Sequence, residues 1–187
     1  SVVALLSTLM TLGLALIAAV SFVSLAQLFG LGSEEGIELQ YGGLTQLNLR
    51  GLLLAGMLIG ALGVLDDITT AQTAAIQELH RANPKLTVLD LYQRGMSIGR
   101  EHITSLVNTL ALAYAGVSLP MLLVFQLYQQ PLWVTLNSEF VVEEIVRTVV
   151  GSMALAVAVP ITTWLAAKWF VEWFPKSTPA EPHQHYH

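Results

Sequence analysis

Long apolar stretches alternate with short polar segments along this chain. Four stretches are near or above the roughly 20 residues that a helix needs to cross the hydrocarbon core of a bilayer. They cover about residues 2–28, 49–79, 103–127 and 145–170. The pattern predicts an all-α, polytopic integral membrane protein with four transmembrane helices. We expect a membrane domain over residues 1–176 and a disordered tail over residues 177–187.

Composition supports the membrane assignment. Hydrophobic residues make up 54% of the chain and charged residues only 11%, whereas soluble domains carry roughly 25% charged residues. The net charge of −5 argues against a nucleic-acid partner, which requires a basic surface. The partner that we expect is therefore the lipid bilayer. The chain has no Cys, which excludes disulfides and thiolate metal sites, and the sequence predicts no cofactor or metal.

The placement of Lys and Arg predicts the orientation. Six of the eight basic residues fall on one side of the predicted spans: Arg81, Lys85, Arg94, Arg100, Lys168 and Lys176. Because basic residues concentrate in cytoplasmic segments, we expect both termini in the cytoplasm, in a bacterial cytoplasmic (inner) membrane. The segment Asp90–Arg100 is expected to begin the third helix at or below the cytoplasmic interface.

Asp66 and Asp67 are the candidate functional centre. They lie midway between Arg50 and Arg81, which are 31 residues apart, or about 46 Å of helix. A carboxylate at the bilayer centre costs about 2.5–3.5 kcal/mol on insertion scales. Two adjacent carboxylates also repel each other, so the pair can load and release protons as a unit. A structural hydrogen-bonding pair and a cation-binding site are the alternatives.

Two polar stripes predict a path to the acid pair. The first, on the second span, consists of Asp66, Thr70, Thr73 and Gln77. The second, on the third span, consists of Glu101, Thr104 or Ser105, and Asn108. Tyr114 falls near the depth of the acids. Each stripe follows one helix face, so we expect the two to face each other and hold water, with ordinary interhelical hydrogen bonding as the alternative.

Three glycines share a helix face with Asp67, namely Gly56, Gly60 and Gly63. Small residues at this spacing let another helix approach closely. We therefore expect them to pack a neighbouring helix against Asp67.

The remaining polar motifs predict no enzyme. His183, His185 and His187 alternate in the tail and are interpreted as a solvated end. His102, beside Glu101, is either a proton relay or an interfacial residue. A Gly-rich phosphate loop is absent, and no Ser/His/Asp set has a useful spacing.

Three motifs resemble the YibE/F-like membrane protein family: GVLDDITTAQT at residues 63–73, SIGREHITSLVNTLALAYAGVSLPMLLVF at residues 97–125 and EEIVRTVVGSMALAVAVPITT at residues 143–163. The resemblance covers most of residues 2–170. The family name alone implies no defined activity.

A more distant likeness is to half of a resistance-nodulation-division transporter, a class related to the Sec accessory D/F proteins. It implies that Asp66 and Asp67 match an acid pair that couples proton flow to work, and that the four spans correspond to helices three to six of a six-helix half. A second copy or a partner subunit would then supply the other half. We expect a proton-coupled transport or energy-transducing subunit. The alternative is a non-transporting accessory subunit of a larger membrane complex.

Overall fold

The computed structural model describes residues 2–32, 48–127, 129 and 131–173. These residues form five helices, α1 (Val2–Leu25), α3 (Leu49–Ala82), α4 (Val88–Leu127), α5 (Leu132–Leu136) and α6 (Glu139–Trp173). The four long helices are long and apolar enough to cross a membrane, so the predicted all-α fold with four spans is confirmed. The predicted tail and its three histidines lie outside the described residues.

The helix ends follow local sequence signals. Helix α3 ends before Pro84, and the backbone N–H of its C-cap Asn83 donates to the Leu79 carbonyl. Helix α4 begins with a reciprocal cap in which the Thr87 N–H donates to the Asp90 carboxylate and the Asp90 N–H donates to the Thr87 hydroxyl. The predicted lead-in segment Asp90–Arg100 is therefore continuous with the third span.

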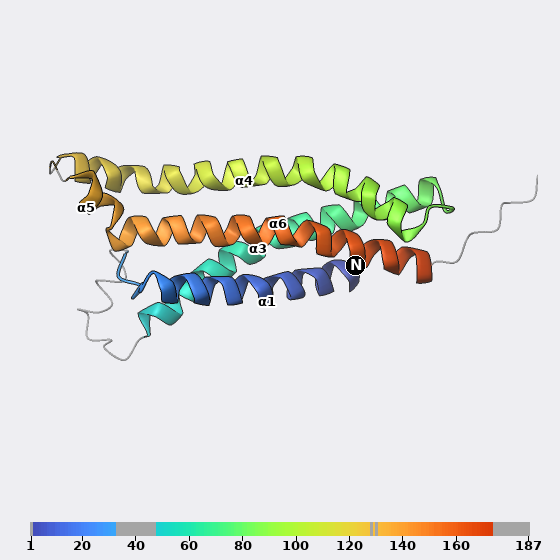
Figure 1. Ribbon diagram of the computed structural model, residues 1–187, viewed down its shortest axis with the longest axis horizontal. Coiled ribbons are helices and arrows are strands. Elements are labelled where there is room, and N and C mark those ends of the chain that lie inside the picture. Colours follow the sequence, from blue (N-terminus) through green and yellow to red (C-terminus); the bar gives the residue numbers. More distant parts are fainter. Residues whose placement is uncertain (1, 33–47, 128, 130, 174–187) are drawn as a thin grey trace, which may run out of the picture.

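Helix α6 is the centre of the bundle. It contacts α1, α3 and α4 and lies between α4 and α1, with α3 crossing behind it (Figure 1). Fully buried alanines such as Ala158 and Ala166 let the neighbouring helices approach α6. At one end of the bundle, Val3 of α1 shares an apolar cluster with Phe170 of α6. The first and last helices thus start and finish on the same side, as an even number of crossings requires.

At the opposite end, the segment after α1 is held against the start of α6. One carboxylate oxygen of Glu139 accepts backbone N–H bonds from Phe29, Gly30 and Leu31, at 2.6, 2.8 and 3.2 Å. Consecutive N–H groups of this kind form a concave anion-binding turn. Gly30 has a φ of +86°, and a Cβ there would meet the Leu49 carbonyl oxygen, so this turn requires glycine.

Gln72 joins three helices near the other end. Its side-chain N–H groups donate to the Gly95 carbonyl of α4 and to the Thr163 hydroxyl of α6, both at 2.8 Å. Gly95 and Gly99 allow this approach, because an added Cβ at Gly95 would meet Ile76 and one at Gly99 would meet Val159 and Gln72. The close packing of α4 on α3 and α6 therefore depends on these two glycines.

This packing predicts opposite outcomes for two substitutions on the same helix. Gly99→Ala should lower the free energy of unfolding, since overpacking costs about 1–3 kcal/mol and exceeds the helix-propensity gain of about 1 kcal/mol. Gly116→Ala is the matched control and should raise the free energy of unfolding, because an added Cβ there has no described atom within 4 Å. Melting temperatures of the two variants in one detergent test the prediction, and equal melting temperatures would contradict it.

Candidate membrane-embedded acid site

Asp66 and Asp67 lie near the middle of α3 on the face that points away from the bundle. Their neighbours Leu65 and Ile68 are 1% and 2% exposed, whereas both aspartates are exposed. Neither carboxylate has a hydrogen-bond or ion-pair partner within the described part of the chain. The structure therefore places two adjacent carboxylates, neither with a described partner, on the outer surface of a membrane-spanning helix.

The glycines of α3 share this outward face. An added Cβ at Gly56 or Gly63 would find no described atom within 4 Å, and one at Gly60 would lie 3.9 Å from the Tyr114 hydroxyl. The prediction that all three pack a neighbouring helix is therefore wrong for the part of the chain that the structure describes, because there only Gly60 faces one. The close helix contacts use glycines of α4 and α6 instead.

The polar stripe of α3 turns away from α4. Thr70 is exposed and Gln77 is half-buried. Thr73 is buried and donates to the Thr69 carbonyl at 2.7 Å. The Thr69 hydroxyl lies 2.6 Å from the Thr8 hydroxyl of α1. The stripe thus begins on the open surface at Asp66 and Thr70. Further along α3, at Thr73, it reaches the interface with α1.

The stripe of α4 lies on the opposite surface from α3. Glu101, Thr104 and Asn108 are all exposed, on the side of the helix opposite Gly95 and Gly99. The Thr104 hydroxyl donates to its own helix, at the Arg100 carbonyl. The predicted arrangement of two facing stripes is therefore wrong within one chain. Neighbouring Ser105 and His102 are also exposed.

Tyr114, like the buried Thr73, is a predicted lining residue that faces other helices, and it belongs to a polar cluster not anticipated from the sequence. The Arg147 guanidinium lies 6.0 Å from the centre of the Tyr114 ring and 3.3 Å from the Glu144 carboxylate. The side chains of Arg147 and Glu144 are 32% and 13% exposed. Both residues lie in the early turns of α6, where Arg147 faces α3 and α4 and Glu144 faces α4.

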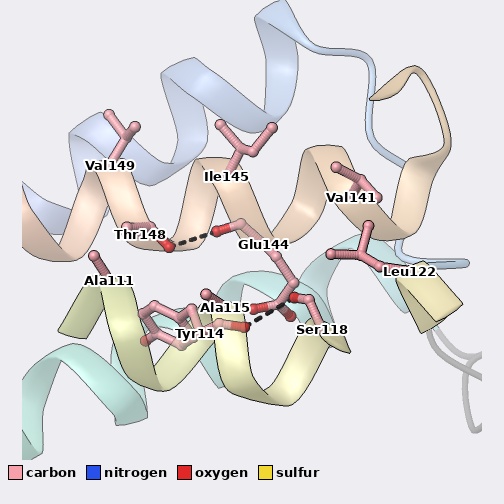
Figure 2. Close-up of a pocket in the computed structure, with 10 residues that line it drawn as sticks. All are labelled: Ala111, Tyr114, Ala115, Ser118, Leu122, Val141, Glu144, Ile145, Thr148 and Val149. Atoms are coloured by element: carbon pink, nitrogen blue, oxygen red, sulfur yellow. Dashed lines mark hydrogen bonds between the residues drawn. The ribbon is translucent and has the colours of Figure 1, made fainter. Parts of the chain in front are cut away.

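The Arg147–Glu144 pair also carries unused hydrogen-bonding groups. Glu144 Oε2 and Arg147 Nε are buried and have no partner among the described residues. The close-up in Figure 2 shows the Glu144 side chain reaching from α6 toward Ser118 and Ala115 of α4. The i,i+3 spacing of Glu144 and Arg147 was the available sequence signal, since side chains at that spacing share a helix face.

Four spanning helices with an acid pair at mid-helix define a multi-pass integral membrane protein. The chain belongs to the YibE/F-like protein family, whose family model matches residues 1–172. Comparisons with curated proteins and with solved structures give no match.

The two ion pairs found among the described residues predict different costs of removing the basic partner. Arg147→Gln leaves a mostly buried Glu144 without its counter-charge. We expect the free energy of unfolding to fall by about 1–3 kcal/mol, below the range for fully buried pairs because Arg147 is partly exposed. Arg81→Gln is the control, because the side chains of Arg81 and Glu78 are 64% and 69% exposed and little change is expected. Thermal unfolding in detergent measures both, and an equal loss would refute the distinction.

Proposed function

We propose that this protein is a proton-coupled transport or energy-transducing subunit of a bacterial cytoplasmic membrane, and that Asp66 and Asp67 are its coupling site. The observation that carries the proposal is the position of two adjacent carboxylates at mid-helix, on a face that the described residues leave uncovered. The distant likeness to half of a resistance-nodulation-division transporter implies the same role for this pair.

The energetics of the bilayer support this role. A charged carboxylate in hydrocarbon costs about 2.5–3.5 kcal/mol on insertion scales. The pair avoids that cost by holding protons, by reaching a water-filled space or by meeting another protein. A group whose protonation changes with its surroundings converts movement of a neighbouring helix into uptake or release of a proton.

The surface beside the pair supports completion by another protein. Gly56 and Gly63 leave room for a close helix approach directly beside Asp67. We propose that a second copy of the chain covers this face and closes the site, with both termini in the cytoplasm. On this arrangement Thr70 lies within the completed site, and Glu101 and Asn108 of α4 face lipid or a further subunit.

Substitution of the acids tests the coupling role. Asp67→Asn and Asp66→Asn keep nearly the same shape and remove the titrating group, so we expect each to reduce proton uptake at least tenfold. The measurement is the pH change inside proteoliposomes of the full chain after an imposed pH gradient. Glu78→Gln, at an exposed position near the end of the same helix, is the control. Normal flux in both aspartate variants would exclude the proposal.

An accessory subunit is the second candidate, and the surface of α4 favours it. Apolar residues such as Leu112 and Val117 are 74% and 68% exposed. In the most apolar stretch of α4, only 6% of the residues are buried. In a bilayer this surface suits either lipid or a partner's helices. On this reading the acid pair bonds to a partner subunit and carries no proton flow.

Cysteine cross-linking separates the two candidates. The natural chain has no Cys, so single substitutions report one position each. We expect Gly63→Cys to form disulfide-linked dimers in native membranes under mild oxidation, because the proposed second copy lies against this face. Gly13→Cys on α1, also without a described neighbour within 4 Å of an added Cβ, should stay monomeric. Cross-links from Gly63→Cys only to a different protein would favour the accessory role.

A further inference from the structure

A groove between α4 and α6 lies apart from the acid pair. It has a volume of about 270 Å³ and lies beside the Tyr114–Glu144–Arg147 cluster. It is lined by the short side chains of Ala111 and Ala115 on α4 and by Glu144 and Thr148 of α6, which Figure 2 shows on the side of α6 that faces α4. Leu122, Ile145 and Val149 are exposed, so the groove opens sideways, toward the lipid that surrounds a spanning helix.

The polar side chains of the groove differ in what they can still bind. The Ser118 hydroxyl donates to the Tyr114 carbonyl at 2.9 Å, and the Thr148 hydroxyl donates to the Glu144 carbonyl at 2.8 Å. Both hydroxyl hydrogens are therefore used within their own helices. The Glu144 carboxylate uses one oxygen for Arg147, and its Oε2 has no partner in the described chain. The groove thus combines apolar walls with one carboxylate that has spare acceptor capacity.

The charge around Glu144 selects the ligand's polar group. Within nine residues at the start of α6, Glu139, Glu143 and Glu144 stand against the single cation Arg147, a formal excess of two negative charges. A charged donor also makes a stronger hydrogen bond to a carboxylate than a neutral donor makes. The excess negative charge and the stronger hydrogen bond from a charged donor both favour an ammonium group over a hydroxyl. The negative charge also disfavours an anion.

We propose that this groove binds a single-chain amphiphile with a primary ammonium head, which enters from the bilayer and donates to Glu144. The volume lies just below the roughly 300–1,000 Å³ of pockets for drug-sized ligands, so it holds the head and the first part of the chain while the rest stays in lipid. The Glu144 side chain is 13% exposed and its Oε2 is covered by neighbouring atoms, so the ammonium group reaches this oxygen only after the Glu144 side chain shifts toward the groove. The proposal does not depend on proton coupling at Asp66 and Asp67.

Photolabelling tests the proposal on the full chain in phosphatidylcholine nanodiscs, whose lipid has no primary amine. The probe is dodecylamine with a diazirine in its alkyl chain, and the comparison probe is the same chain with a hydroxyl head. Mass spectrometry locates the label. We expect the amine to label residues 111–122 and 141–149, excess unlabelled dodecylamine to compete, and the alcohol to label these segments at least fivefold less.

Two variants examine the head and the chain separately. Glu144→Gln should reduce the competable labelling about tenfold, and Ala115→Leu should remove it by filling the groove. Glu172→Gln, at an exposed position on the opposite end of the same helix, should leave it unchanged. The proposal is overturned by labelling that unlabelled amine does not compete, by equal labelling with the alcohol, or by full labelling of Glu144→Gln. Full labelling of Ala115→Leu would overturn it as well.

Discussion

Hydrocarbon offers a polar group neither a donor nor an acceptor, so a membrane protein must supply both from its own chain or from a partner. Most of the buried polar side chains here obey this constraint internally. Thr8 meets Thr69 between α1 and α3, and Gln72 bonds to α4 and α6 at once. Glu139 takes three backbone N–H groups at the opposite end of the bundle. These contacts fix the positions of the helices, and the apolar surface of α6 fills the space between them.

The acidic residues at Glu144 and at Asp66–Asp67 differ in whether the described chain supplies a positively charged partner. Glu144 is partly buried and has a guanidinium beside it, which itself lies over an aromatic ring. Asp66 and Asp67 have no such partner in the described chain and lie on its outer surface. A charge compensated within the fold can be structural, whereas an uncompensated one at mid-membrane depends on what is outside the chain. This contrast is why the coupling proposal concerns the aspartates and the binding proposal concerns the glutamate.

Sequence patterns determined the elements but not which faces meet. Runs of about 20 apolar residues indicate membrane spans. Thr87 caps the start of α4, and Pro84 follows the end of α3 because the residue before a proline disfavours helical geometry. In contrast, the stripes of Asp66 and Asn108 were each correctly periodic, but periodicity does not say which neighbour a face has. The outcome was decided by Gly95 and Gly99, which bring the other side of α4 against α3. The contact of Arg147 with Tyr114 was not predicted either, because the sequence does not show which neighbour that face of α6 meets.

The exposed acid face makes the single chain an incomplete description of its own site. Gly56 and Gly63 have no described neighbour, yet glycine in a helix costs up to about 1 kcal/mol relative to alanine. No contact among the described residues offsets this cost, whereas another helix that came close enough to exclude lipid from Asp67 would offset it. The same approach would change the surroundings of the carboxylates whenever the two helices separated or closed. Assembly and proton exchange would then be one event at one surface, since the helix that covers the acids also sets whether they can hold a charge.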